Sequence, residues 1–178
     1  MSDLVDIIIV GGGIAGASLG AELARGRRVM IVEAEEVCGY HATGRSAAFY
    51  LESYGGPEVA KLTIASGPFL TAGGYLRHRG ALHLGRGEWP ELPNGVESRR
   101  VAREEIAAIV PGVRPEWDHA LFEPGCADID VARLHAAYLA AFGRAGGIVR
   151  TGCALVWAEY AEGVWTAGLA DGSQVNGA

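Results

Sequence analysis

The sequence has few of the residues that typify nucleic-acid-binding or membrane-anchored proteins. Lys61 is its only lysine, and no run of arginines forms a polybasic segment. The formal net charge is −6, whereas a protein that binds nucleic acid through the phosphate backbone needs a basic face. Both observations argue against a nucleic-acid partner and against an electrostatic membrane anchor.

Cysteine is also scarce. Cys38, Cys126 and Cys153 form no CxxC pair and have no metal-ligand spacing, and the five histidines show no HxxH or HxxxH pattern. An odd, sparse set of cysteines is typical of a reducing compartment. We therefore expect buried or half-buried thiols, solvent or core histidines, no metal site, and a location in the cytoplasm.

No hydrophobic run is long enough to cross a membrane without interruption. The longest apolar stretch, residues 4–24, contains Asp6, Glu22 and four glycines before Ala17, and no basic segment precedes it. A membrane span needs about 20 predominantly apolar residues, and a signal peptide starts with a positively charged region. We expect neither, and peripheral association with the inner face of the membrane stays open.

Glycine is the residue in excess, with 27 of 178 positions against a usual share of roughly 7%. There is no Gly-X-Y repeat and proline numbers only 7, so collagen-like and low-complexity chains are excluded. Hydrophobic residues make up 49% of the chain, enough to bury a core. The length corresponds to about 1.2 average domains, and the glycines are expected in its loops.

The first third of the chain predicts a strand–helix–strand unit. Residues 5–10 are a β-branched run that ends at glycines, typical of a buried parallel strand. Residues 14–25 have alanines at helical spacing, with Gly26 as the C-terminal cap, and residues 28–32 form a second strand that ends at Glu33. Together they have the size of a βαβ unit.

The rest of the chain has a weaker pattern. Residues 34–56 are predicted to be irregular, and a helix that starts near Pro57 is expected to kink or end at Gly67–Pro68. The further expected elements are strands at 81–83, 120–122, 148–156, 164–169 and from 174, and helices at 101–109 and at 131–144, the latter capped by Asp130.

Residues 11–16 read Gly-Gly-Gly-Ile-Ala-Gly and match G-x-G-x-x-G between the first strand and the first helix. In this motif Gly11 permits a tight turn, Gly13 lets a pyrophosphate approach the backbone, and Gly16 lets the helix pack closely on the strand. The phosphates then bind at the positive end of the helix dipole. Glu33, about 20 residues further on, is placed to accept hydrogen bonds from ribose hydroxyls. The motif predicts FAD or NAD and disfavours NADP.

A second signature, GYHATGRSAAFY at residues 39–50, stands where a simple NAD dehydrogenase would begin its next helix. Such an irregular segment can present N–H groups and a fixed cation to a second anionic or electron-rich group. Together with GGGIAGAS, SYGGP at 53–57 and ADIDVARLHAAYL at 127–139, it resembles FAD-dependent oxidoreductases of the D-amino acid oxidase superfamily. The likeness is greatest to bacterial D-amino acid dehydrogenases of the D-arginine dehydrogenase type.

The resemblance implies an α/β fold, with a Rossmann-like FAD-binding domain and the beginning of an α+β substrate domain. Residues 1–80 would form the FAD-binding βαβ unit with its flavin loop, 81–125 part of the substrate domain, and 126–178 an incomplete return to the FAD-binding domain. In the family, the arginine that binds the substrate carboxylate and a second FAD-binding glycine segment lie further along the chain. We therefore expect a truncated, N-terminal portion that binds FAD poorly and catalyses nothing on its own.

The resemblance also assigns residues to the cofactor and to the substrate. Tyr54 would cover the substrate and Phe49 would face it, while no residue is assigned as a catalytic base. Arg45 would contact the flavin, and the competing interpretation is an ion pair with Glu33 or Glu35. The cofactor-binding residues that it implies are Gly11, Gly13, Ile14, Ala15, Gly16, Glu33, Ala34, Thr43, Gly44, Arg45, Ser46, Ala47 and Ala154.

The implied reaction is oxidation at the α-carbon of an amino acid or related amine, with electrons passed on to a quinone or oxygen. Phe49 stands where the relatives have a histidine, which favours an apolar or smaller substrate over a cationic one. Oxidation of a hydroxy acid or sugar phosphate, and a non-catalytic nucleotide-binding fragment, stay open as alternatives. Asp128 and Asp130 resemble paired catalytic carboxylates, but helix capping explains Asp130.

Overall fold

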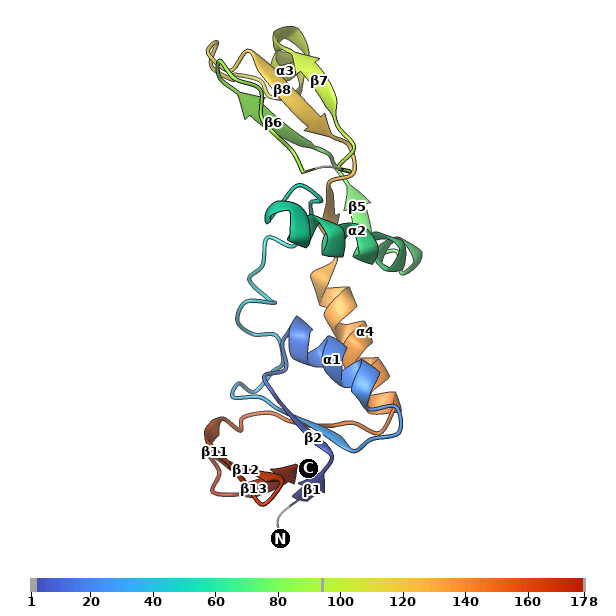
Figure 1. Ribbon diagram of the computed structural model, residues 1–178, viewed down its shortest axis with the longest axis vertical. Helices are drawn as coiled ribbons and strands as arrows, with labels where there is room; N and C mark the ends of the chain where they lie inside the picture. Colours follow the sequence, from blue (N-terminus) through green and yellow to red (C-terminus); the bar gives the residue numbers. More distant parts are fainter. Residues whose placement is uncertain (1–2, 94, 178) are drawn as a thin grey trace. The chain divides into compact units, whose positions relative to one another are not determined.

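The computed structural model describes residues 3–93 and 95–177, and the chain divides into two compact units (Figure 1). The first unit combines Met1–Ala47 with Val131–Ala178, and the second is Ala48–Asp130. The predicted boundaries lie after residues 80 and 125. The structure groups residues 48–80 with the second unit because the strands at Phe49–Tyr50 and Leu76–His78 both pair with the strand at Ala127–Ile129.

The first unit contains two sheets and two helices. Its elements are β1 (Asp3–Val5), β2 (Ile7–Val10), α1 (Ile14–Leu23), β3 (Val29–Val32), α4 (Val131–Arg144), β10 (Ile148–Arg150), β11 (Leu155–Ala161), β12 (Val164–Leu169) and β13 (Gln174–Gly177). A parallel sheet has the order β10-β3-β2. The other sheet, β1-β13-β12-β11, is antiparallel except for the parallel pair β1–β13.

The core of the first unit lies between the parallel sheet and its two helices. All of β3 is buried, since a central parallel strand is covered on both faces. Helices α1 and α4 lie side by side (Figure 1), and Phe142 of α4 is fully buried between them and the sheet. Gly20 of α1 makes this possible, because a Cβ there would come within 3.1 Å of both Phe142 and Ile31. This packing fixes where α1 begins relative to the strands.

Two strands expected as single runs are divided, and those predictions are wrong. The run 5–10 breaks at Asp6, whose carboxylate accepts a hydrogen bond from the Arg28 N–H at 2.6 Å. The run 148–156 breaks at Gly152, which has φ +63° and donates its N–H to the Glu35 carbonyl at 2.7 Å. In both cases a tertiary hydrogen bond turns the chain from one sheet into the other.

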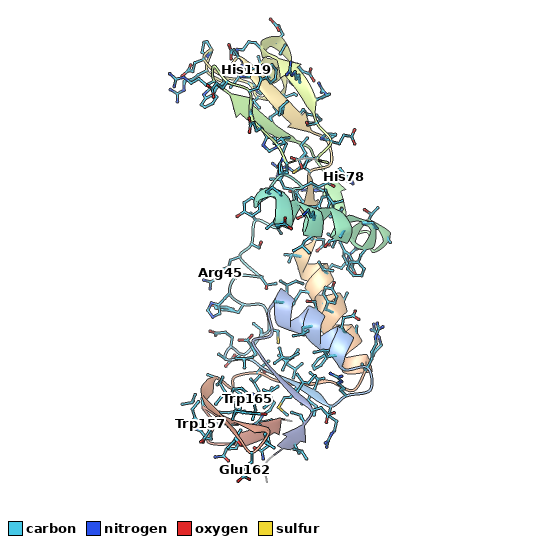
Figure 2. All side chains as sticks on the ribbon, viewed as in Figure 1. Arg45, His78, His119, Trp157, Glu162 and Trp165 are labelled. Carbon is cyan, nitrogen blue, oxygen red and sulfur yellow. The ribbon has the colours of Figure 1, made fainter. Side chains whose placement is uncertain are left out.

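The hairpin of β11 and β12 turns at Glu162 and Gly163, which have φ values of +51° and +84°. Figure 2 labels Trp157, Glu162 and Trp165 on this hairpin. The Trp165 ring lies 5.2 Å from the Tyr160 ring, yet Trp165 remains half exposed. The two tryptophans thus cover the surface of the hairpin rather than fill a core.

The second unit contains two small antiparallel sheets and two helices. Its elements are β4 (Phe49–Tyr50), α2 (Gly56–Ala72), β5 (Leu76–His78), β6 (Ala81–Gly85), β7 (Arg99–Ala102), α3 (Arg103–Ile109), β8 (His119–Glu123) and β9 (Ala127–Ile129). The sheets have the orders β4-β9-β5 and β6-β8-β7. Val101, predicted in a helix, lies in β7, where it packs with Ile106 of α3 and Ala120 of β8.

Helix α2 continues through Gly67–Pro68, so of the two predicted outcomes, a kink or an end, the end is wrong. Gly67 is buried against Tyr50, and a Cβ on Gly67 would lie 2.5 Å from the Tyr50 hydroxyl oxygen. Proline in a helix interior removes one backbone donor and costs about 3 kcal/mol. The buried Tyr50 ring packs on the helix at Gly67 and so helps to hold it together at this point.

Within the described ranges, no helix combines the length and the apolar character needed to cross a membrane. The same part of the chain contains no group of three or more His, Cys, Asp or Glu side chains that could hold a metal ion.

The turn between β12 and β13 carries a carboxylate whose pKa is lowered. Asp171 accepts hydrogen bonds from the Ser173 hydroxyl at 2.6 Å and the Ser173 N–H at 2.9 Å, and the Arg150 guanidinium lies 2.7 Å away. These contacts, the Ser173 hydroxyl first among them, lower the pKa of Asp171 from 3.8 to about 2. The folded chain therefore holds this carboxyl in its ionised form.

Stability of the first unit is expected to depend on Asp171 at acid pH. The unfolded chain takes up this proton more readily, so the contribution is present above about pH 4 and is lost as the pH falls toward about 2. In urea unfolding from pH 6 to pH 2, the stability difference between wild type and Asp171→Asn should shrink as the pH falls. Glu162→Gln on the neighbouring turn is the matched control, and a difference that is constant with pH would contradict the assignment.

Candidate functional site

The turn between β2 and α1 is fixed by three hydrogen bonds around Gly11 and Gly12. Gly11 has φ +94°, a conformation that favours glycine, and its N–H donates to the Val32 carbonyl at 2.8 Å. The Gly12 N–H donates to Glu33 Oε2 at 2.7 Å, and the Gly12 carbonyl accepts from His135 Nε2 at 2.7 Å. The turn is therefore held by its own sheet, by the acid after β3 and by helix α4.

Gly16 lets α1 begin directly against this turn. A Cβ on Gly16 would collide with the Gly11 carbonyl oxygen. Gly13 is the N-cap and has no side chain to cap the helix, and the first turn of α1 carries no acidic residue. The N–H groups and the positive end of the dipole at this terminus thus face no competing negative side chain of α1. One of them, the Ile14 N–H, donates to Thr43 Oγ1 at 2.9 Å.

Glu33 lies where β3 ends and links two other segments of the first unit. Its Oε1 accepts from the Glu35 N–H at 3.0 Å, and its backbone carbonyl accepts from the Cys153 N–H at 2.8 Å. The structure thereby brings the Cys153–Ala154 segment beside the acid. The Ala154 carbonyl itself accepts from the Ala170 N–H at 2.9 Å.

Cys38 lies beneath the glycine turn, where its sulfur occupies the space that a Gly12 Cβ would need. Burial, and secondarily the Glu33 carboxylate, raise the pKa of the Cys38 thiol above its ordinary value of 9.0. The thiol is therefore neutral at neutral pH and is a packing residue rather than a nucleophile.

The segment from Gly39 to Ala47 is irregular, as predicted. The Gly44 N–H donates to the Gly39 carbonyl at 2.7 Å, which closes a turn in the segment. The Arg45 guanidinium lies 4.9 Å from the centre of the Tyr40 ring, a cation–π contact. Figure 2 labels Arg45. Among the described residues Arg45 forms no ion pair with Glu33 or Glu35, and Glu35 instead lies 2.7 Å from His41 Nε2.

The structure brings the expected cofactor-binding residues into one unit. All of them, from Gly11 to Ala47 and also Ala154, belong to the first unit, and Thr43 Oγ1 lies 3.1 Å from where a Gly13 Cβ would be. The two residues expected to contact substrate, Phe49 and Tyr54, belong to the second unit.

A family model described as DAO, FAD dependent oxidoreductase, matches residues 6–177. The chain belongs to this family. FAD is the cofactor of the family, so the predicted cofactor and the predicted α/β flavoprotein fold are confirmed. The particular likeness to D-arginine dehydrogenases stays a prediction.

Three solved structures illustrate the similarity in fold. Glycine oxidase from Geobacillus kaustophilus has a TM-score of 0.81 at 20% identity, over 99% of this chain and 54% of that one. The amino acid oxidase NikD has a TM-score of 0.83 at 20% identity, over 99% of this chain and 50% of that one. The L-α-glycerophosphate oxidase of Mycoplasma pneumoniae with FAD bound has a TM-score of 0.80 at 17% identity, over 97% of this chain and 52% of that one. The chain thus spans about half the length of these proteins.

The residues at the glycine turn of this chain fit the adenosine diphosphate half of FAD. No heavy atom lies within 4 Å of where a Gly11 Cβ would be, so the space beside the turn is open. The α1 terminus offers N–H donors without a capping side chain on Gly13. A carboxylate has about four acceptor positions, and Glu33 uses two of them for the N–H groups of Gly12 and Glu35. The remaining positions suit ribose hydroxyls.

His135 contacts the glycine turn although no motif in the sequence links it to the cofactor. It was expected to be a solvent or core histidine, and it is indeed buried, with 8% of its surface exposed. Leu134, His135 and Phe142 are the buried residues of α4. A polar side chain on the buried face of a helix requires a hydrogen-bond partner. A histidine on the apolar face of the helix predicted at 131–144 could therefore have indicated a buried polar contact.

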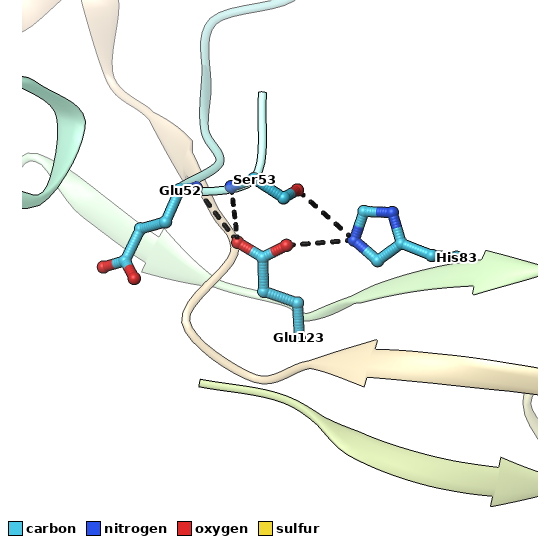
Figure 3. Close-up of polar contacts among 4 residues, drawn as sticks. All are labelled: Glu52, Ser53, His83 and Glu123. Atoms are coloured by element: carbon cyan, nitrogen blue, oxygen red, sulfur yellow. Dashed lines mark hydrogen bonds and ion pairs between the residues drawn. The ribbon is translucent and has the colours of Figure 1, made fainter. Parts of the chain in front are cut away.

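In the second unit, a buried carboxylate anchors the segment that precedes Tyr54 (Figure 3). Glu123 is 1% exposed, and its Oε1 accepts from the N–H groups of Glu52 at 2.9 Å and Ser53 at 3.3 Å. Its Oε2 lies 2.9 Å from His83 Nε2, and the same nitrogen lies 3.4 Å from Ser53 Oγ. In a serine triad the serine and the carboxylate bind different ring nitrogens, whereas here both lie beside His83 Nε2. The cluster therefore anchors the backbone and does not activate Ser53 as a nucleophile.

Phe49 is half exposed and lies beside a charged cluster of the second unit. The Arg79 guanidinium lies 4.8 Å from the centre of its ring. Arg77 and Arg79 both bind Asp128, at 2.8 Å and 3.0 Å, and these contacts, Arg77 first, lower the pKa of Asp128. Asp128 is therefore an ionised partner of two arginines.

Tyr54, the other residue predicted to contact substrate, is more exposed than Phe49, with 73% of its surface accessible.

Proposed function

We propose that this protein oxidises the α-carbon of an amino acid or related amine, with FAD as the acceptor. The observation that carries the proposal is the glycine turn, in which Gly12 is fixed on both sides and Glu33 ends β3, within a chain that the FAD-dependent oxidoreductase family matches over residues 6–177. Glycine oxidase and NikD, two proteins of similar fold, are amino acid oxidases by name.

Within this proposal the first unit holds the cofactor. The N–H groups at the start of α1 bind the pyrophosphate, because they are donors at the positive end of a helix dipole. Glu33 and Ala34 bind the adenosine ribose, and the backbone at Ala154 meets the adenine. The segment Thr43–Ala47 contacts the ribityl and flavin parts, where Arg45 supplies a positive charge.

Bound FAD supplies an acceptor for the hydride that leaves the substrate α-carbon. The contribution of the chain is orientation, since hydride transfer needs the Cα–H aimed at the acceptor and the amine uncharged. We assign no general base to the described residues.

We propose further that the substrate has an apolar side chain and is a D-amino acid. Phe49 presents an apolar ring, and two arginines with a single carboxylate lie beside it. Close guanidinium groups disfavour a cationic substrate such as D-arginine. The similar fold of the L-α-glycerophosphate oxidase keeps a second candidate open, a hydroxy acid or sugar phosphate.

A substrate panel tests the proposal on the full-length protein. We expect kcat/KM for D-leucine or D-phenylalanine to exceed that for D-arginine by at least about tenfold, since a favourable pocket contact is worth 1–3 kcal/mol. Phe49→Leu is the matched control and should keep this order. The acceptor is identified by comparing oxygen with a soluble quinone.

Two results would contradict the proposal. Preference for D-arginine would overturn the assignment of an apolar substrate. Oxidation of glycerol 3-phosphate, with no turnover of any amino acid or amine, would overturn the reaction itself in favour of the second candidate.

A further inference from the structure

We propose that His135 is a positioning residue for FAD that acts on both cofactor-binding segments of the first unit. Its imidazole orients the Gly12–Gly13 peptide and supports the turn at Gly39. The inference deepens the proposed function, because it rests on the assignment of the glycine turn and of the Gly39–Ala47 segment to FAD.

The contact with the glycine turn defines the protonation of the ring. His135 Nε2 lies 2.7 Å from the Gly12 carbonyl oxygen, in buried surroundings. A carbonyl oxygen only accepts hydrogen bonds, so Nε2 carries a proton. The ring is thus a fixed donor from α4 to the turn before α1.

This hydrogen bond determines where the next N–H group points. The peptide between Gly12 and Gly13 is trans, because the described residues contain no cis peptide. In a planar trans peptide the C=O and the N–H point in opposite directions. With the Gly12 carbonyl held toward His135, the N–H of Gly13 is directed away from the ring. Gly13 is the N-cap of α1, so this N–H belongs to the donor set at the helix terminus.

Glu33 completes the restraint from the other side of Gly12. Its Oε2 accepts the Gly12 N–H at 2.7 Å, which fixes the peptide between Gly11 and Gly12. Both peptides that flank Gly12 are therefore set before any phosphate arrives, one by an acceptor from β3 and one by a donor from α4. Preorganised donors bind an anion without the cost of ordering them.

The same ring also packs on the second cofactor-binding segment. A Cβ on Gly39 would lie 2.9 Å from His135 Cε1 and 3.1 Å from Nδ1, so the ring rests directly on the glycine backbone. Gly39 has φ +78°, and its carbonyl closes the turn with Gly44. The imidazole thus contacts one segment with its N–H and the other with its ring.

Two substitutions separate the two contacts. His135→Phe keeps a ring against Gly39 but removes the donor and leaves the Gly12 carbonyl without its partner. His135→Gln keeps an N–H donor at similar reach but removes the ring. We expect His135→Phe to weaken FAD binding about tenfold or more, and His135→Gln by less than about threefold. The dissociation constants are measured by flavin fluorescence on the protein from the complete reading frame.

Amide NMR of the 178-residue chain without flavin gives a second readout. The Gly13 amide resonance should shift in His135→Phe and stay near its wild-type position in His135→Gln. The Gly39 amide resonance should shift in His135→Gln and stay near its wild-type position in His135→Phe. A Gly13 resonance that is unchanged in His135→Phe would overturn the proposal. So would a loss of FAD affinity that is the same in both variants and is explained by their loss of thermal stability.

The outcome is separable from that of the proposed reaction. A wild-type protein that binds FAD yet oxidises no amino acid would overturn the proposed function. In that case the contrast between the Phe and Gln variants would still decide the role of His135.

Discussion

Gly16→Ala is expected to lower the affinity for FAD by about 100-fold and to destabilise the first unit. The added Cβ would meet the backbone oxygen of Gly11 rather than the end of a flexible side chain. Helix α1 or the glycine turn must then move, and overpacking of this kind costs about 1–3 kcal/mol. Because the displaced atoms carry the N–H groups that we propose bind the pyrophosphate, binding is expected to suffer along with folding.

Gly143→Ala supplies the matched control for this substitution. Gly143 is also a helical glycine of the first unit, but it is exposed and nothing lies within 4 Å of where its Cβ would be. Replacing such a glycine by alanine is expected to stabilise the unit by about 0.5–1 kcal/mol. Urea unfolding and FAD titration of both variants give the comparison. A Gly16→Ala protein with wild-type stability and affinity would refute the role of close packing at Gly16.

The glycine turn could be predicted from the sequence because the signal for it is local, although two of the hydrogen bonds that fix it are not. The β-branched run, the Gly-rich turn and the alanine-rich helix follow each other directly, and each segment favours one conformation by itself. The places where the prediction was wrong have distant causes. Asp6 ends a strand by binding Arg28, and Gly152 ends another by binding Glu35. The hydrophobic pattern within either run cannot predict a hydrogen bond to a residue outside the run.

The contacts that complete the site depend on tertiary packing even more strongly. Thr43 reaches Ile14 across 29 positions, and His135 reaches Gly12 across 123. The sequence predicted two cofactor-binding segments, one from a motif and one from a resemblance, and the structure places both in the first unit. It did not indicate that a helix from the far end of the chain would fix the motif, because that follows only once α4 packs beside α1.

Glu123→Ala is expected to destabilise the second unit by about 3–5 kcal/mol. The substitution removes the acceptor of two backbone N–H groups and of His83. The two N–H groups and the His83 ring are part-buried and lose their acceptor, and an unsatisfied buried group costs about 1–3 kcal/mol. The strand predicted at residues 120–122 stops short of Glu123, which is the last residue of β8.

Glu123→Gln separates the loss of hydrogen bonds from the loss of charge. Its amide oxygen can still accept from the N–H groups of Glu52 and Ser53, and its amide N–H can donate to His83 if the ring changes tautomer. We expect it to recover more than half of the stability lost in Glu123→Ala. Glu97→Ala, at an exposed position of the same unit, serves as the surface control.

Limited proteolysis connects this anchor with the segment that carries Tyr54. Glu123 holds the backbone at Glu52 and Ser53, directly before Tyr54, so its loss should release that segment before the rest of the unit unfolds. Cleavage near residues 51–55 should be faster in Glu123→Ala than in wild type under conditions where both remain folded, with Glu123→Gln in between. Equal cleavage rates in the three proteins would show that the carboxylate stabilises the β6-β8-β7 sheet without ordering the segment before Tyr54.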